Sequence, residues 1–315
     1  MSEPVLRAAV VGVGHLGRHH ARILSSMAGV SLVAVVDVNG PRARDIAAGC
    51  GARAFTDARE ILDQVDLVSI ATPTEVHGEV ACLFLERGIP VLVEKPLARS
   101  VVEADLIIRA AAAAGATLAV GHTERFNPAV MAARPAVQNP GFVEVHRLGT
   151  FPERSLDIDV VFDLMIHDLD LILSMVSSEI EAIEAVGVPV LTDRADIANA
   201  RLRFASGCVA NITASRISRD RIRKIRFFQR DAYISIDCGS REAEAFRLVR
   251  HPDRRPTIEG GPIPVQDSEP LRNELEDFAA AVRDKRPPLV GGADGRRAVA
   301  VAEQITERMA ACTRI

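Results

Sequence analysis

The chain has 315 residues, of which 48% are hydrophobic and 25% are charged, and its formal net charge at pH 7 is −4. This length exceeds what one hydrophobic core usually holds, so we expect two globular domains. The charge excludes a broad basic field for nucleic acid, and no apolar run reaches the ~20 residues that span a bilayer.

The cysteines and the N-terminus indicate a cellular compartment. The five cysteines are scattered, without a CxxC pair. This spacing excludes a disulfide framework and a structural zinc site. Residues 1–4 lack the basic and apolar parts of a signal peptide. We therefore expect a cytoplasmic protein without a bound metal.

Up to about residue 120, apolar runs alternate with helical segments. The expected strands are Leu6–Val11, Ser31–Val36, Asp66–Ala71, Pro90–Val93 and Ala116–Val120. The expected helices are Leu16–Met27, Pro41–Ala48, Asp57–Gln64, Glu75–Arg87 and Ser100–Ala114. Continuous apolar strands are typical of a parallel sheet covered on both faces, so this part predicts a doubly wound α/β domain at 1–121.

The remaining residues, 122–315, predict a second α/β domain, whose last helix could pack back on the first. Successive strands with few helices between them indicate an antiparallel or mixed sheet. These strands are Gly141–Phe151, Ile180–Val190, Asp196–Phe204, Cys208–Arg216, Lys224–Gln229, Ala232–Asp237 and Ala245–His251. The expected helices are Val160–Ser174, Leu271–Arg283 and Gly295–Met309, and His251–Gly261 is expected to be a loop.

The most specific motif follows the first expected strand. In GVGHLG, Gly12 permits a tight turn, Gly14 lets the backbone approach a pyrophosphate, and Gly17 lets the helix pack close to the strand. The helix N-terminus then offers N–H groups to phosphates. Twenty residues later Asp37 ends the second strand, where a carboxylate binds ribose hydroxyls and repels a 2′-phosphate. NAD is therefore favoured over NADP, although Arg42 and Arg44 could hold a phosphate or could be solvated at the start of the next helix.

Three further motifs carry candidate chemistry. ATPTEVH at 71–77 and EKPLA at 94–98 follow strand ends, where ligands bind in open α/β sheets. Lys95 could hydrogen-bond a reacting oxygen, or be a surface lysine. In DLMIHDLD, Asp163 and His167 are four residues apart and share one face of a helix, as a proton acceptor and its carboxylate do. The alternatives are turn chemistry at 71–77 and a structural histidine at 167.

Together these motifs resemble the Gfo/Idh/MocA family of nicotinamide-dependent oxidoreductases over essentially the whole chain. The resemblance rests on GVGHLG at 12–17, Asp37, ATPTEVH at 71–77, EKPLA at 94–98, GHTERFNP at 121–128 and DLMIHDLD at 163–170. It implies an N-terminal Rossmann domain and a C-terminal α/β domain with a large open, mainly antiparallel sheet. Because that sheet commonly builds subunit contacts, the resemblance also implies a homodimer or homotetramer.

The resemblance also implies roles for individual residues. Lys95 would contact the reacting hydroxyl, His167 would relay the proton, and Asp163 would bind substrate or tune that relay. The implied cofactor-binding residues are Gly12, Gly14, His15, Leu16, Gly17, Asp37, Thr72, Pro73, His77, Glu94 and Lys95. One departure is that many members carry glycines before the DLMIHDLD aspartate, where this chain has Asp157 and Asp159, which either meet a polar substrate or are solvated.

The GHTERFNP stretch resembles members that oxidise the 3-hydroxyl of a UDP-N-acetylhexosamine, which makes UDP-N-acetylglucosamine the expected substrate. In that reading Arg125 and Asn127 face the substrate. A basic stretch could hold the diphosphate, or could be the solvated face of a strand. It contains Arg216, Arg219, Arg221, Arg223, Lys224, Arg226 and Arg230. The alternatives are a dehydrogenase of free polyols or inositol, and a cofactor-binding regulatory protein without turnover.

Overall fold

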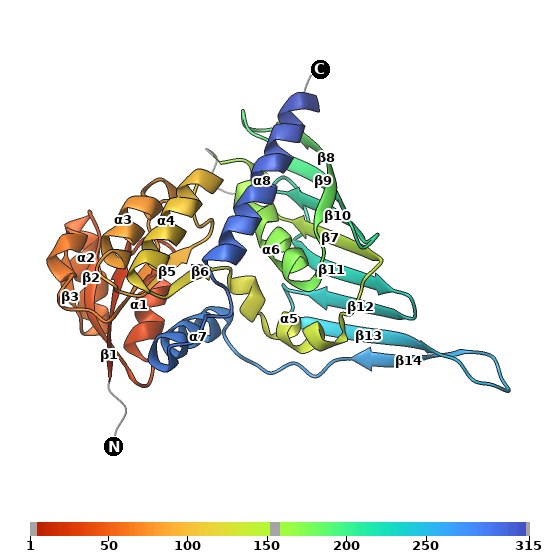
Figure 1. Cartoon of the computed structure of the whole chain (residues 1–315), viewed down its shortest axis with the longest axis horizontal. Coiled ribbons are helices and arrows are strands. Elements are labelled where there is room, and N and C mark those ends of the chain that lie inside the picture. Colours follow the sequence, from red (N-terminus) through yellow and green to blue (C-terminus); the bar gives the residue numbers. More distant parts are fainter. Residues whose placement is uncertain (1–4, 152–157, 313–315) are drawn as a thin grey trace. The chain divides into compact units, whose positions relative to one another are not determined.

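A computed structural model describes residues 5–151 and 158–312 (Figure 1). The chain divides into two compact units. The first contains the chain up to Thr123 together with Pro270–Val299, and the second contains Glu124–Glu269 and the chain from Ala300 onward. In the part of the chain that is described, no helix is long and apolar enough to cross a membrane.

The first unit is a doubly wound domain, as predicted. Its strands are β1 (Leu6–Val11), β2 (Val30–Val36), β3 (Arg53–Phe55), β4 (Leu67–Ile70), β5 (Val91–Glu94) and β6 (Leu118–Gly121). They pair in parallel in the order β3-β2-β1-β4-β5-β6. Because β1 lies at the centre, where the strand order reverses, the carboxyl ends of β1 and β4 border the position at which such sheets bind ligands.

Five α-helices of the described chain lie wholly within this unit. They are α1 (Gly17–Ser25), α2 (Gly40–Cys50), α3 (His77–Leu85), α4 (Val101–Ala114) and α7 (Pro270–Asp284). Buried side chains of α1 and α7 share one core with β1 and β2, while α3 packs against α4. The predicted Ser100 cap is confirmed, since its hydroxyl accepts the Glu103 N–H at 3.2 Å, and Gly115 ends α4 in a left-handed conformation.

Two short elements of this unit differ from the prediction. The third expected helix is only a 3₁₀ turn, η1 (Ala58–Ile61), although Asp57 does cap it within a capping box. Strand β3 was not predicted, because three residues are too short for a pattern. A second 3₁₀ turn, η2 (Thr74–Val76), precedes α3.

The second unit contains the predicted mixed sheet. Its strands are β7 (Phe142–Leu148), β8 (Ile180–Val188), β9 (Ile197–Phe204), β10 (Val209–Ser215), β11 (Ile222–Gln229), β12 (Ala232–Asp237), β13 (Glu242–Val249) and β14 (Thr257–Pro262). The order is β14-β13-β12-β11-β7-β10-β9-β8, and all pairs are antiparallel except β7 with β10. The expectation of a loop at His251–Gly261 was wrong at its end, because β14 begins at Thr257.

Helices cover one face of this sheet (Figure 1). They are α5 (Pro128–Ala133), η4 (Arg134–Ala136), the π-helical turn η5 (Val161–Met165), α6 (Ile166–Met175) and the end of α8 (Gly292–Cys312), which all contribute side chains to the core of this unit. The 3₁₀ turn η3 (Thr123–Phe126) precedes α5. Along β9 every second residue is buried, so alternate side chains enter the core beneath the helices. Gly187 lets α8 approach, since a Cβ there would lie 2.5 Å from the Met309 sulfur.

Candidate functional site

The glycine motif forms the predicted tight turn between β1 and α1. Gly12 has a φ of +82°, and its N–H donates to the Val36 carbonyl at 2.8 Å. A Cβ on Gly17 would lie 1.8 Å from the Gly12 carbonyl oxygen. The turn therefore tolerates no side chain at Gly12 or Gly17, as a dinucleotide-binding loop requires.

The outer side of the same loop is open. A Cβ on Gly14 would meet only the Arg42 guanidinium, at 3.8 Å. Leu16 caps α1 without a side-chain hydrogen bond and is 44% exposed. The imidazole of His15 lies beside Arg18, with Nδ1 3.3 Å from Nη2. The loop therefore has room for a phosphate group against its backbone and against the positive end of the helix.

The Asp37 carboxylate is buried and directed towards this loop. Its Oδ2 accepts the Val13 N–H at 3.0 Å, and its Oδ1 accepts the Asn39 N–H at 2.8 Å. Each oxygen keeps a lone pair that can accept a ribose hydroxyl. The guanidinium of Arg42 lies 3.5 Å from Oδ2, so a cation stands beside the carboxylate that would select NAD.

The predicted residues after β4 and β5 are joined by a buried histidine. His77 is 1% exposed, its Nδ1 lies 3.0 Å from the Pro96 carbonyl, and its Nε2 lies 3.0 Å from the Thr72 carbonyl. Burial lowers the pKa of His77 below its usual value, although both carbonyls oppose the shift. His77 thus ties the Thr72–Pro73 turn to the loop that carries Lys95.

Glu94 and Lys95 lie at the carboxyl end of β5. Glu94 is 6% exposed, whereas Lys95 is half-buried. Oε1 of Glu94 lies 3.0 Å from Nε2 of His20, and Oε2 accepts the Lys95 N–H at 3.0 Å. Burial alone would raise the pKa of the Glu94 carboxyl, but His20 and Lys95 outweigh it and hold this pKa below its usual value. Sequence reasoning missed His20, which has the ordinary appearance of a residue inside an amphipathic helix.

In the second unit, Asp163 and His167 lie at the start of one continuous helical segment. Asp163 belongs to the π-helical turn η5, and His167 to the first turn of α6. Both side chains are half-buried. The residues on either side of His167 are buried, whereas Phe162 and Leu164, on either side of Asp163, are themselves half-buried. Oδ1 of Asp159 accepts the N–H groups of Val161 and Phe162 at 2.8 and 3.2 Å, so Asp159 caps this segment. Asp157 lies outside the described residues.

The π-helical turn is a feature that the sequence pattern did not predict. Such turns are rare and occur frequently at functional sites. The cap and the turn together set where Asp163 and His167 project. This placement is compatible with the predicted acid–base role and does not test it.

The structure gives Arg125 and Asn127 buried partners within the second unit. Arg125 makes a bidentate ion pair with Asp170, with Nε–Oδ2 and Nη2–Oδ1 distances of 2.7 and 3.0 Å. The Asn127 amide caps α5 through the Ala129 N–H and donates to the Cys238 carbonyl, at 3.1 and 3.0 Å. These contacts assign both residues to the scaffold, and their predicted contact with substrate stays a prediction.

A second buried ion pair lies beside the first. Nε and Nη2 of Arg147 each lie 2.8 Å from the Asp168 carboxylate, and Nη1 lies 3.0 Å from Glu124. Asp168 and Asp170, the two acids that follow His167, thus both pair with buried arginines. Sequence reasoning had not assigned them. Two acids at alternate positions in an otherwise apolar helix were the only available signal.

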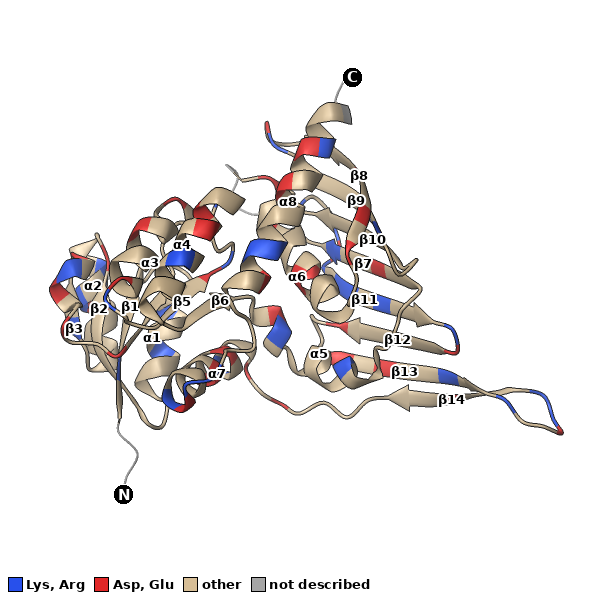
Figure 2. Ribbon diagram, viewed as in Figure 1, with Lys and Arg blue, Asp and Glu red and all other residues tan. Residues whose placement is uncertain are grey.

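The basic stretch does not form one surface. Arg216 is 1% exposed and pairs with Asp196 at 2.9 Å, and Arg226 on β11 pairs with Glu144 on β7 at 2.6 Å. Figure 2 shows basic residues along β11 with acidic residues on neighbouring elements. The predicted diphosphate contact is not tested by these pairs, although Arg216 is buried in a structural one.

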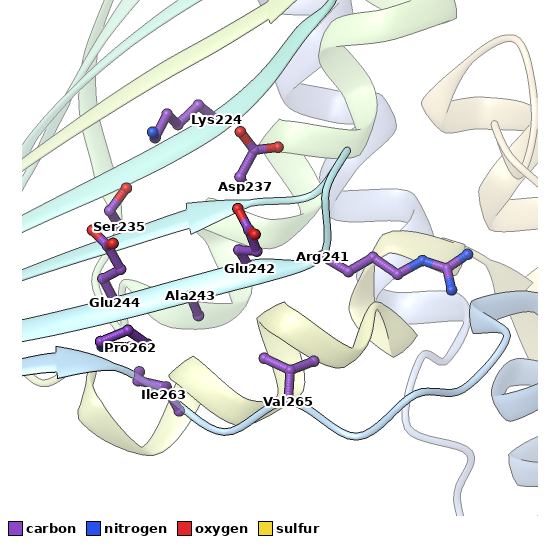
Figure 3. A pocket seen from close by; sticks show the side chains of 10 residues that line it. All are labelled: Lys224, Ser235, Asp237, Arg241, Glu242, Ala243, Glu244, Pro262, Ile263 and Val265. Atoms are coloured by element: carbon purple, nitrogen blue, oxygen red, sulfur yellow. The ribbon is translucent and has the colours of Figure 1, made fainter.

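A pocket lies in the second unit at the ends of β12 and β13 (Figure 3). Its lining mixes the basic Lys224 and Arg241 with the acidic Asp237, Glu242 and Glu244. Apart from Lys224 of the basic stretch, it contains no residue that the sequence motifs had singled out. The candidate cofactor residues are instead assembled within the first unit, at the carboxyl ends of β1, β2, β4 and β5.

Comparisons with known proteins agree with this arrangement. Residues 6–122 match the family model of an oxidoreductase family with an NAD-binding Rossmann fold, and residues 141–234 match a GFO/IDH/MocA C-terminal domain. UDP-N-acetylglucosamine 3-dehydrogenase of Acidithiobacillus ferrooxidans is 40% identical over 95% of this chain and 96% of its own. A solved structure of that enzyme has a TM-score of 0.91 over 99% of both chains, at 38% identity.

More distant relatives share the architecture. Inositol 2-dehydrogenase of Rhizobium meliloti is 28% identical over 97% of both proteins. Levoglucosan dehydrogenase in complex with NADH has a TM-score of 0.87 over 97% of both chains at 21% identity, which shows a shared fold.

Proposed function

Since the chain belongs to the Gfo/Idh/MocA family of NAD-binding oxidoreductases, we propose that it oxidises the 3-hydroxyl of UDP-N-acetylglucosamine with NAD. The observation that carries this proposal is the 40% identity to the Acidithiobacillus enzyme along 95% of the chain. The motifs at 12–17, 71–77 and 94–98 lie within residues 6–122, and the motif at 163–170 lies within residues 141–234, which are the ranges that the two family models match. Dehydrogenation of free inositol is the alternative, favoured by the more distant inositol relatives.

We propose that the first unit holds the cofactor. The loop of Gly12, Gly14, His15, Leu16 and Gly17 fits a pyrophosphate because its outer side is open and its helix start lacks a side-chain cap. Asp37 would accept the adenosine ribose hydroxyls. NAD, when bound, accepts a hydride from the carbon that bears the oxidised hydroxyl.

The nicotinamide ribose would lie near the turn after β4 and the loop after β5. We propose Thr72, Pro73, His77 and Glu94 for this region. Since the polar atoms of His77 and Glu94 already contact protein groups, their contribution would be to hold these two loops. The Thr72 hydroxyl is buried and has no hydrogen-bond partner among the described residues, so it is available to a ligand.

Proton handling is proposed for Lys95 and His167. The Lys95 ammonium would donate a hydrogen bond to the substrate oxygen and stabilise negative charge on it as its proton leaves. His167 would accept that proton, and Asp163 would orient the imidazole or bind the sugar. Arg125 and Asn127 remain predicted substrate residues, but their buried contacts support a scaffold role.

A homo-oligomer in the cytoplasm also remains a proposal. On the sheet face opposite the helices, four aromatic side chains form a row across β7, β11, β12 and β13. The row is Phe142, Phe228, Tyr233 and Phe246, with ring centroids 5.3–6.4 Å apart. Such a row would suit contact with a second copy. Sedimentation of the purified protein tests this, and a monomer would contradict it.

Turnover with a panel of substrates tests the proposed function. Purified protein and NAD are mixed with UDP-N-acetylglucosamine, myo-inositol or glucose, and NADH formation is followed by absorbance. A parallel set contains 2-oxoglutarate, because tightly held NADH needs an acceptor before the next turnover. We expect NADH only with the nucleotide sugar. Turnover of myo-inositol alone would contradict the proposed substrate and favour the alternative.

A further inference from the structure

Three buried polar side chains meet beneath the loop that carries Lys95. They come from α1, β4 and β5 of the first unit. His20 and Ser69 have no exposed surface, and Glu94 is 6% exposed. Nδ1 of His20 lies 2.7 Å from the Ser69 hydroxyl, and Nε2 lies 3.0 Å from Oε1 of Glu94. The imidazole therefore connects the ends of two neighbouring strands.

The chemistry of the groups fixes the direction of these hydrogen bonds. An ionised carboxylate only accepts, so Nε2 of His20 carries the proton that is donated to Glu94. Nδ1 can then accept from the Ser69 hydroxyl. This order of hydroxyl, imidazole and carboxylate also occurs in hydrolases. Here Ser69 has no exposed surface through which a substrate could reach it, so the three residues serve to hold the carboxylate.

The second carboxylate oxygen of Glu94 connects these three residues to the main chain of Lys95. Oε2 of Glu94 accepts the Lys95 N–H at 3.0 Å. Gly121 closes the other side, since a Cβ there would lie 3.1 Å from Oε2 and 3.0 Å from the Glu94 Cα. Beyond Lys95, the Pro96 carbonyl oxygen lies 3.0 Å from Nδ1 of His77. The main chain on both sides of the Lys95 Cα thus contacts buried side chains.

We propose that His20 is a positioning residue for Lys95: through Glu94 it fixes the Lys95 main chain and keeps a negative charge beside the ammonium. This inference rests on the proposed function, in which Lys95 contacts the reacting oxygen. Misplacement of a reacting group by about 1 Å can cost on the order of 100-fold in rate, so a residue that never touches the substrate can control kcat.

Two substitutions of His20 separate its two hydrogen bonds. In His20→Gln the amide nitrogen occupies the place of Nε2 and still donates to Glu94. In His20→Asn the shorter amide reaches only towards Ser69, and the donor to Glu94 is lost. Both variants replace the same buried imidazole with an amide, so each is the matched control for the other.

We expect His20→Asn to lower kcat by about 10- to 100-fold, with the NADH dissociation constant within about threefold of wild type. His20→Gln should recover kcat to within about threefold. A role in folding alone would lower the melting temperature of both variants and leave kcat per folded molecule unchanged, which would overturn the inference.

Hydrogen exchange of the Lys95 amide, measured by NMR, reports on the hydrogen bond from Lys95 to Glu94 in the absence of substrate. We expect protection in wild type and His20→Gln, and faster exchange in His20→Asn; equal protection in all three would overturn the inference. Absence of turnover by wild type would contradict the proposed function and leave this measurement decisive for His20.

Should His20→Asn fail to fold, Glu94→Gln keeps the shape of the side chain and removes its charge. Without that neighbour the Lys95 ammonium loses its proton more readily, so the alkaline limb of the kcat–pH profile should move to lower pH. An unchanged profile would overturn the inference.

Discussion

Arg125 and Asp170 face each other inside the second unit, with Nε 2.7 Å from Oδ2 and Nη2 3.0 Å from Oδ1. The side chains are 4% and 1% exposed. Removing one partner leaves the other as an uncompensated buried charge, which is far more costly than losing both.

We therefore predict that the stability losses of the two single substitutions do not add up in the double variant. Arg125→Met alone should lower the free energy of unfolding by about 3–5 kcal/mol, and the double variant with Asp170→Leu should recover most of that loss. Chemical denaturation of the four proteins of the cycle measures this. If Arg125→Met unfolds like wild type and only raises the KM for the nucleotide sugar, Arg125 is a substrate residue and the scaffold assignment is wrong.

The buried carboxylate of Asp196 should make the stability of the folded protein depend on pH in the acid range. Its Oδ2 accepts three backbone N–H groups, from Val190, Leu191 and Thr192, and Oδ1 accepts from Arg216. Burial alone would raise the pKa of Asp196, but these hydrogen bonds hold it well below its usual value. Because the folded-state pKa is depressed, the stabilisation is complete above the unfolded value of about 3.9 and is lost as the pH falls below it towards the folded pKa.

Asp196→Asn should remove that acid dependence. The variant should be less stable at neutral pH by about 3–5 kcal/mol, and the difference from wild type should shrink as the pH is lowered through the acid range. The exposed neighbour Asp193 provides the control, since Asp193→Asn should stay within about 0.5 kcal/mol of wild type. A constant difference from pH 7 to the acid limb would contradict the depressed pKa.

Alanine variants at three glycines distinguish a glycine required for packing of the loop from one required for the approach of the cofactor. Gly17→Ala places a Cβ 1.8 Å from the Gly12 carbonyl oxygen, so we expect a lower melting temperature and loss of NADH binding. Gly14→Ala meets only Arg42 at 3.8 Å, so it should keep the melting temperature and still weaken NADH, because the backbone can no longer approach the pyrophosphate.

Gly49 in α2 is the control, because a Cβ there meets nothing within 4 Å. Gly49→Ala should leave NADH binding unchanged and raise stability by up to about 1 kcal/mol. Calorimetry with NADH measures all three variants. Equal affinity in Gly14→Ala and Gly49→Ala would contradict the placement of the phosphates.

Lys95→Met tests the proposed catalytic lysine. It keeps the length of the side chain and removes the ammonium, so kcat should fall by about 100- to 10,000-fold while NADH binding is largely kept. Single-turnover kinetics separate the chemical step from release. Full turnover by this variant would remove Lys95 from the mechanism.

The predictable parts of the fold were the long periodic ones. The strand Leu6–Val11 was predicted with the bounds that β1 has, because an apolar run ended by a glycine turn has few alternatives. β14 was missed because Gly260, Gly261 and Pro262 are typical of loops, and its pairing with β13 is a tertiary contact that no local pattern reports. The six-residue α5 was missed because it is too short to show a helical period, despite its Asn127 cap.

The motifs of the candidate site were recognised from the sequence, but the buried partners that hold its side chains were not. Gly12, Gly17 and Asp37 carry a spacing that has one good structural explanation, and the structure places them as that explanation requires. The partners of Glu94 and Asp168 lie 74 and 21 residues away in sequence, at His20 and Arg147. Such pairs follow from the fold and leave no local periodicity, so the sequence could name candidate reacting groups but not the residues that hold them.

The central claim is that the hydride leaves C3 of the nucleotide sugar, and isotopic labelling tests it most directly. UDP-N-acetylglucosamine carrying deuterium at C3 is incubated with the enzyme and NAD, and the reduced cofactor is analysed by mass spectrometry. We predict reduced cofactor that carries the deuterium, together with a 3-keto product that has lost it. Unlabelled NADH formed from the labelled sugar would show oxidation at another carbon and contradict the account.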